Sequence, residues 1–310
     1  MEAEADVNFE DEPLSSQPSG SSGEASPPPA DPGRNDSAAD QGNVPVFQPS
    51  VPPARFVRED LRVPWGWFDL LLFVLIAVVA TMFLGMAVFA GFATLHLRLS
   101  DLQASPRLGG VVNIVADVLL FAALTGFLAL QIRWRFRAPF WRTIGWRPLE
   151  TANHPRALTY AGFIAGGLLL ALFVQLGAAA FGTKSKLPIE DLFQDRVVVV
   201  LVLLLSVLMA PVVEETIFRG YIYPVIARSF GRGVGVLATG LLFGLLHAPQ
   251  LWTGWVQIGL LVIVGIVFSY ARAVKGTVVA SYLLHLSYNF TVSFAFLLGS
   301  HWLRVLPSGP

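Results

Sequence analysis

Residues 197–219 read VVVVLVLLLSVLMAPVVEETIFR, an apolar run that carries no charge until it reaches two adjacent glutamates. A helix needs about 20 residues to cross a hydrocarbon core about 30 Å thick, and lipid admits only helices or closed barrels. The run does not alternate apolar and polar residues, so it predicts a membrane-spanning helix rather than a barrel strand. We expect such helices over residues 68–93, 109–132, 157–181, 197–218, 233–248, 255–272 and 276–299.

These seven segments predict an all-α, polytopic transmembrane helical bundle, and a segment near residues 248–255 leaves an eighth span possible. The composition agrees, because 54% of the 310 residues are hydrophobic and 14% are charged. Soluble domains carry roughly 25% charged residues. The chain has no cysteine, which excludes disulfides, thiolate metal sites and a cysteine nucleophile.

The formal net charge of zero conceals two oppositely charged parts. Residues 1–45 hold ten acids and one base in a sequence rich in Pro, Ser and Gly, which predicts disorder because little apolar surface can be buried. We therefore divide the chain into a disordered acidic tail and linker (1–64), a transmembrane helical domain (65–300, with its polar motifs within 195–299) and a C-terminal tail (301–310).

Lys and Arg are distributed unevenly between the predicted connections. The connection 133–156 carries six arginines and one acid, and loops with such an excess lie on the cytoplasmic side. This predicts an integral protein of the cell (inner) membrane with a cytoplasmic N-terminus. The lipid bilayer is thus an expected partner, and the balanced net charge argues against nucleic acid as another.

Two adjacent carboxylates follow the apolar residues 197–213. Glu215 and Arg219 are four residues apart, so they share one face of a helix and can pair. Glu214 points about 100° away and has no such counter-ion. Ionisable side chains inside membrane helices are costly and often mark function, which makes Glu214 a candidate general base. The structural alternative is a solvated glutamate pair at the membrane surface with a snorkelling arginine.

Two histidines complete the polar clusters of the last third of the chain. Phe243 and His247 share a face at the end of their predicted helix, and His285 and Asn289 share a face inside theirs. A lone histidine at a helix end is usually structural. A histidine and an asparagine one turn apart within a span indicate either a functional site or a hydrogen bond that joins two helices.

The spacing along the chain predicts that Glu214 and His247 lie at the same depth. The turn between their helices is expected at residues 228–232, with a midpoint near 230.5, so each lies 16.5 positions away (230.5 − 214 and 247 − 230.5). In an antiparallel hairpin the two helices are about 8–10 Å apart. That spacing suits one water or one metal between the side chains. Gly240 and Gly244 would let another helix approach this one closely.

The ordered set E-E-x-x-x-R (214–219), F-x-x-x-H (243–247) and H-x-x-x-N (285–289) resembles the CAAX prenyl endopeptidase and bacteriocin-processing family (CPBP, formerly Abi), in its bacterial type. The resemblance covers about a third of the chain. It implies a membrane-embedded endopeptidase with a buried site and a peptide or protein substrate. That substrate is prenylated in the type II CAAX branch, but the family is broad, so the substrate class does not carry over.

The resemblance also implies roles for individual residues. Glu214 would activate the attacking water, His247 would help to hold it, and His285 and Asn289 would stabilise the oxyanion. Glu215 and Arg219 would orient this group, and Phe243 belongs to the same motif set. Two mechanisms stay open. One is a glutamate protease without a metal; the other binds zinc through Glu214, His247 and His285, with one position free for water.

Two other functions compete with the protease interpretation. A non-catalytic immunity or scaffold protein of the same fold would keep the helices without needing Glu214. A transporter that uses Glu214 and Asp117 as proton carriers predicts inverted repeats, which the sequence lacks.

Overall fold

The structure is a computed structural model that describes residues 58–96, 99–151, 155–181 and 187–306. All of them belong to one compact unit, Arg55–Pro310. Within the described ranges the chain is helical and has no strand, which confirms the predicted all-α class. The tail expected to be disordered lies, up to residue 57, outside the described residues.

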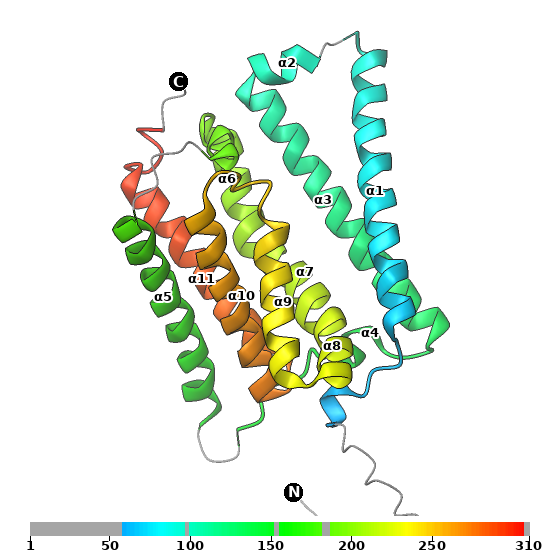
Figure 1. The fold of residues 1–310 in the computed structure, drawn as a ribbon. Coiled ribbons are helices and arrows are strands. Elements are labelled where there is room, and N and C mark those ends of the chain that lie inside the picture. The colour runs from blue at the N-terminus through cyan, green and yellow to red at the C-terminus, as the bar shows by residue number, and fades with distance from the viewer. Residues whose placement is uncertain (1–57, 97–98, 152–154, 182–186, 307–310) are drawn as a thin grey trace, which may run out of the picture. The chain divides into compact units, whose positions relative to one another are not determined.

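Each predicted span coincides with helical structure (Figure 1). These elements are α1 (Trp67–Thr94), α3 (Pro106–Leu130) with its π-helical end η2 (Gln131–Arg135), α5 (Arg156–Phe181), α9 (Arg232–Leu246), α10 (Trp255–Lys275) and α11 (Val278–Gly299), together with the continuous stretch 196–230. The shorter elements are η1 (Glu59–Leu61), α2 (Leu99–Ala104), α4 (Phe140–Thr143) and η3 (Pro188–Phe193).

The stretch 196–230 contains two π-helical segments. It consists of α6 (Arg196–Leu204), the π-helical η4 (Leu205–Met209), α7 (Ala210–Glu215), the π-helical η5 (Thr216–Ile222) and α8 (Tyr223–Phe230). Pro211 and Pro224 stand near the starts of α7 and α8. A proline ring collides with the carbonyl four residues earlier in an α-helix, and a wider π turn before it relieves the collision. Glu214 and Glu215 therefore stand on a short α-helix between two π segments.

The apolar span predicted over 197–218 is part of a longer helical stretch that continues to Phe230, and the turn predicted at residues 228–232 is confirmed. The polar residues from Glu214 to Arg219 lower the local hydropathy, which suggested that the apolar span ends there. The helix continues through them, and Glu215, Thr216 and Arg219 are buried and hydrogen-bonded. The chain turns at Gly231, whose φ of 93° lies in the region that glycine favours, and α9 begins at the next residue.

Five helical stretches of the described residues are long and apolar enough to cross a membrane. They are Trp67–Thr94, Pro106–Arg135, Arg156–Phe181, Arg196–Phe230 and Trp255–Lys275. The other two expected spans fall short for different reasons. α9 has 15 residues, fewer than the roughly 20 that a span needs. α11 has 22 residues, but Ser281, His285 and Asn289 are among them and lower its hydropathy.

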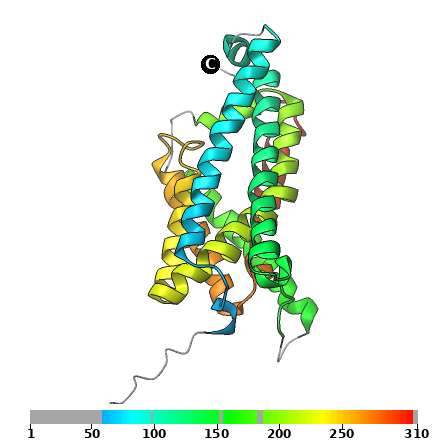
Figure 2. The ribbon, with the colours of Figure 1, turned by 90° about the vertical axis from the view of Figure 1, so that its right-hand side faces the viewer.

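The helices that carry polar motifs pack together, and α1 pairs with α3 beside them. α5 packs on α11, α11 on α10, and α10 on α9. Figure 2 turns the side with α1 and α3 toward the viewer. α9 and α10 approach closely, since a Cβ added to Gly240 would lie 2.6 Å from the Ile266 backbone nitrogen and one at Gly244 would lie 2.8 Å from that of Val262. The close approach predicted for this glycine pair is confirmed.

The segment before α1, expected to be a linker, packs onto the helices from Arg58 onward. Asp60 pairs with Arg272 of α10 at 2.8 Å, and Trp65 is completely buried, donating from Nε1 to the Tyr221 carbonyl at 3.0 Å.

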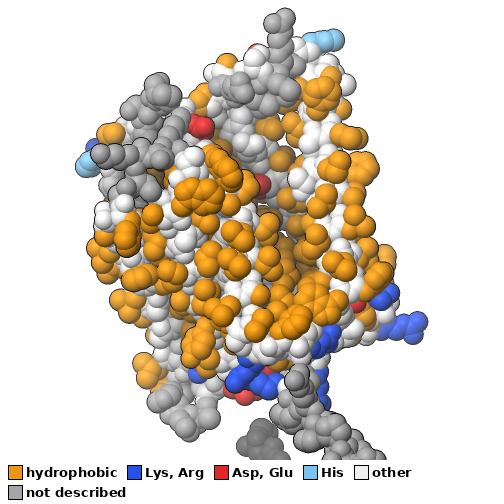
Figure 3. Space-filling view, in the orientation of Figure 1, with side chains coloured by type: hydrophobic (Ala, Val, Ile, Leu, Met, Phe, Trp, Pro, Cys, Tyr) orange, Lys and Arg blue, Asp and Glu red, His pale blue; other side chains and the backbone are white. Residues whose placement is uncertain are grey.

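Figure 3 shows Lys and Arg side chains gathered at the end of the molecule where α8 and α9 meet, while hydrophobic side chains cover the flanks. That distribution is typical of a membrane helical bundle with one basic end.

Candidate active site

Glu215 and Arg219 form a fully buried ion pair. Arg219 Nη1 donates to Glu215 Oε1 at 2.9 Å, and neither side chain has exposed surface, which confirms the pairing predicted from their spacing. Two further donors of Arg219 have partners, with Nη2 donating to the Gly265 carbonyl at 2.7 Å and Nε to Ser269 Oγ at 3.2 Å. Removing a charge from water is costly unless such partners are present.

His285 of α11 lies between the two glutamates of α7. Its Nδ1 is 3.0 Å from Glu215 Oε1, and its Nε2 is 3.7 Å from Glu214 Oε2. An ionised carboxylate accepts hydrogen bonds, so Nδ1 carries a proton and donates to Glu215. The ring stacks on Phe268, with 4.7 Å between centroids. These contacts fix the ring so that Nε2 faces Glu214, as an acceptor in the neutral imidazole or as a donor in the imidazolium.

His247, which directly follows α9, also points its Nε2 toward Glu214, from the side opposite His285. Its Nδ1 donates to the Phe243 carbonyl at 2.8 Å, because a carbonyl oxygen can only accept. Its Nε2 therefore faces Glu214, 3.9 Å from Oε1. The two residues lie at one level of the helical hairpin, in agreement with the equal spacing from the turn.

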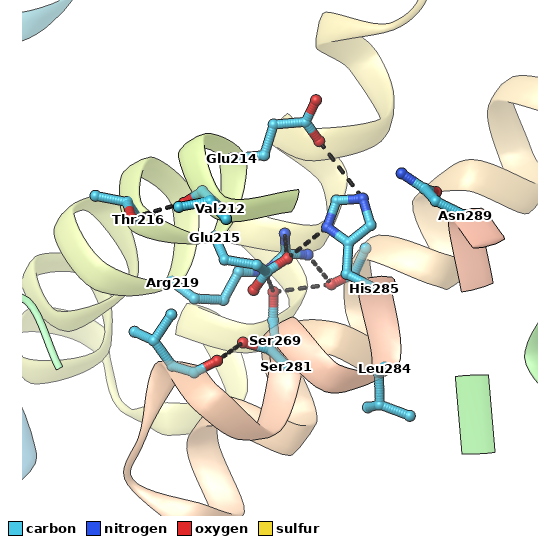
Figure 4. A network of polar contacts seen from close by, with 12 residues as sticks. Val212, Glu214, Glu215, Thr216, Arg219, Ser269, Ser281, Leu284, His285 and Asn289 are labelled. Carbon is cyan, nitrogen blue, oxygen red and sulfur yellow. Dashed lines mark hydrogen bonds and ion pairs between the residues drawn. The ribbon is translucent and has the colours of Figure 1, made fainter. Parts of the chain in front are cut away.

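The side chain of Glu214 is thus flanked by two imidazoles, one on each carboxylate oxygen. Figure 4 shows Glu214 and His285 pointing toward one another from α7 and α11, with Glu215 and Arg219 next to the same ring. The Glu214 side chain is 14% exposed, whereas Glu215 has no exposed surface. The distances from the imidazole Nε2 atoms to the Glu214 oxygens, 3.7 and 3.9 Å, are longer than direct hydrogen bonds, and one water can bridge each of them.

Asn289 lies one turn beyond His285 on α11, and a neighbouring helix holds its amide. Nδ2 donates to the backbone carbonyl of Ser206 in η4 at 2.7 Å. A side-chain amide has two N–H donors, so one of them stays free of this bond. Asn289 is partly exposed, in contrast to the buried His285.

Residues 196–291 match the family model described as Type II CAAX prenyl endopeptidase Rce1-like. The chain carries a domain of this Rce1-like family. The match lies within the motif region 195–299 and confirms the resemblance noted in the sequence. Neither a curated protein nor a solved structure matches the chain. The family name implies peptidase activity, and the long apolar helices are typical of an integral membrane protein.

Sequence reasoning missed one element that supports the Rce1-like domain, the loop after α4. Trp146 Nε1 donates to Thr216 Oγ1 at 3.0 Å, and its ring lies 5.1 Å from that of Tyr282 on α11. The Gly145 carbonyl accepts from the backbone of Val278 at 2.9 Å. This loop lies before the domain and joins the segment that follows Glu215 to the start of α11. The only sequence signal was a tryptophan within the arginine-rich connection 133–156.

The residues suggested for zinc, Glu214, His247 and His285, have suitable donor atoms, and each histidine holds its Nδ1 proton as metal-binding histidines do. Their arrangement does not fit a metal. No group of three or more acidic or histidine side chains in the described part of the chain is placed to hold an ion. We therefore derive no catalytic step through a metal.

Proposed function

We propose that this chain is a membrane-embedded endopeptidase that hydrolyses a peptide bond with a water molecule activated by Glu214. The observation that carries the proposal is the convergence of His247 and His285 on the two oxygens of the Glu214 carboxylate, at 3.9 and 3.7 Å. The Rce1-like domain that contains the three residues supports this reaction class. Glu214 is the general base because Glu215 is already held by Arg219 and His285.

In the proposed reaction, Glu214 takes a proton from a water held by His247 while the water oxygen bonds to the carbonyl carbon of the substrate. The carbonyl electrons move onto oxygen, and this oxyanion accepts hydrogen bonds from protonated His285 Nε2 and from the Asn289 N–H that Ser206 does not use. Glu214 then gives its proton to the amide nitrogen as the C–N bond breaks. The products are an amine and a carboxylic acid.

Glu215 and Arg219 act through His285 rather than on the substrate. Glu215 holds His285 Nδ1, and Arg219 offsets the buried negative charge of Glu215. Phe243 supports Arg219 with its ring face, 4.6 Å from the guanidinium carbon, and holds His247 with its carbonyl. The three residues are positioning residues in this proposal.

We further propose that seven helical segments cross the cell (inner) membrane and that the N-terminus lies in the cytoplasm. α9 and α11, which fall short in length or hydropathy, direct polar residues inward: Thr239 of α9 and Ser281 of α11 are fully buried, and His285 of α11 is 3% exposed. The interior of a bundle tolerates polar residues that lipid would not. The site then lies at membrane depth, and its substrate is a peptide or protein that reaches it from the bilayer or its surface. Prenylated proteins are the first candidates because of the family description.

The proposal is tested by mapping peptide ends in membrane fractions from cells that express the wild type, Glu214→Gln or Glu150→Gln. Glu150→Gln is the matched control, since Glu150 is an exposed carboxylate near the cytoplasmic end. We expect a set of cleaved ends that disappears in Glu214→Gln and persists in the control. Identical ends in all three, with an unchanged cellular phenotype, would contradict the protease and favour a non-catalytic immunity or scaffold protein.

A further inference from the structure

A cavity of about 770 Å³ opens between α3, α4 and the η4–α7 region, outside the site described above. One of its walls is a face of α3 made of small residues, Ala122, Gly126 and Ala129. A Cβ added to Gly126 would meet no atom within 4 Å, so this face borders open space rather than a packed neighbour. Met209 and Val213 form part of the opposite wall.

Two arginines stand at the cytoplasmic mouth of this groove. Arg133 lies on the same face of α3–η2 as the small residues, at positions i, i+4, i+7 and i+11 from Ala122, and Arg142 comes from α4. Both side chains are exposed, and neither guanidinium has a hydrogen-bond or ion-pair partner among the described residues. The adjacent Arg135, by contrast, pairs with Asp69 at 3.2 Å.

The groove is complementary in shape and polarity to an amphiphile with an anionic head. From Ala122 to Arg133 the helix rises about 16 Å, enough for a large part of a fatty acyl chain. Its walls are largely apolar, Trp141 stands at the mouth where aromatic residues meet the headgroup layer, and two free cations face that layer. A free anion would satisfy the arginines and leave the apolar groove unfilled, whereas a neutral lipid would leave the arginines unpaired.

We propose that this groove binds an anionic phospholipid, with its phosphate at Arg133 and Arg142 and one acyl chain along Ala122, Gly126 and Ala129. The bound chain contacts Met209 and Val213, and Val213 directly precedes Glu214. The lipid would therefore complete the packing behind the segment that carries the two glutamates. The binding site does not depend on the proposed protease activity.

The test measures binding of phosphatidylglycerol and phosphatidylcholine to the detergent-purified full chain by native mass spectrometry. We expect Arg133→Gln/Arg142→Gln to weaken phosphatidylglycerol binding about 25-fold, since each basic residue near a membrane surface contributes a factor of about five. Gly126→Leu fills the groove and should weaken it at least about tenfold. Arg137→Gln and Gly259→Leu, an exposed arginine and an open glycine outside the groove, should bind like the wild type.

A second measurement keeps the proposal testable if a variant folds poorly. Phosphatidylglycerol with a photoreactive acyl chain should label the wild-type peptide that contains residues 119–130, and Gly126→Leu should abolish that label. Equal affinity for phosphatidylcholine, displacement by inorganic phosphate alone, wild-type binding by Gly126→Leu, or labelling confined to α1 or α5 would each overturn the proposal.

Discussion

Asn289 on α11 donates its side-chain amide to the backbone carbonyl of Ser206, 2.7 Å away on the helix that carries Glu214. The carbonyl is free because of Pro211. In η4 the Leu205 carbonyl pairs with the N–H of Ala210, five residues on. The partner of Ser206 in this register is residue 211, a proline without an N–H. The same proline thus creates the π segment and leaves the acceptor that orients Asn289.

Replacing Pro211 should release Asn289. In Pro211→Ala the restored N–H competes for the Ser206 carbonyl, and the side-chain amide loses its anchor. We expect Asn289→Ala to lower kcat about 100-fold, as loss of an oxyanion donor does, and Pro211→Ala to lower it about tenfold. The diagnostic is a double-mutant cycle, in which Pro211→Ala should cost almost nothing further once Asn289 is gone. An equal loss in both backgrounds would mean that Pro211 acts through Glu214 instead.

Glu215 should matter for stability as well as for activity. Glu215→Gln leaves Arg219 buried without a counter-ion, and removing one partner of a buried pair costs about 3–5 kcal/mol. Glu214→Gln should leave the free energy of unfolding nearly unchanged, because Glu214 is partly exposed and makes no contact shorter than 3.7 Å to an ionisable group. Unfolding of the purified variants in detergent measures both, with Glu150→Gln as the control. A Glu215→Gln variant as stable as the wild type would contradict the importance of the pair.

Local geometry explains which parts of this site the sequence could predict. The pairing of Glu215 with Arg219 follows from the pitch of one helix, and the common level of Glu214 and His247 follows from one hairpin with a tight turn at Gly231. Both depend on spacings within a short stretch. The contact of His285 with Glu215 depends on how α11 packs against α7, and no spacing within either helix encodes that contact.

The π segments could be inferred only in part. Pro211 and Pro224 stand in the sequence as signals of a disturbed helix, but whether a proline kinks, ends or widens a helix depends on what packs around it. Here Gly220 lies so close to the loop after α4 that a Cβ on it would be 2.8 Å from the Ile144 carbonyl. This contact lies within η5, in the part of the helical stretch that extends beyond the predicted apolar span 197–218 to the turn at Gly231.

Removal of metal ions should leave the activity largely intact. The described residues contain no group of three or more acidic or histidine side chains placed to hold an ion. We expect cleavage by protein treated with EDTA and 1,10-phenanthroline to stay within about twofold of the untreated rate. Elemental analysis provides the independent check. Stoichiometric zinc that is lost in His247→Ala, together with chelator-sensitive cleavage, would contradict the metal-free mechanism.

The seven-span topology can be tested by single-cysteine labelling, because the natural chain has no cysteine to interfere. Ser100, Arg137 and Arg304 are exposed residues in α2, in the connection before α4 and after α11, respectively. With the N-terminus in the cytoplasm and seven crossings, a membrane-impermeant maleimide added to intact spheroplasts should label Ser100→Cys and Arg304→Cys but not Arg137→Cys. Lysis should expose Arg137→Cys to the reagent. Protection of Arg304→Cys in intact cells would instead require an even number of crossings. The end of α11 would then lie in the cytoplasm, and the helix that carries His285 would run in the opposite direction through the membrane.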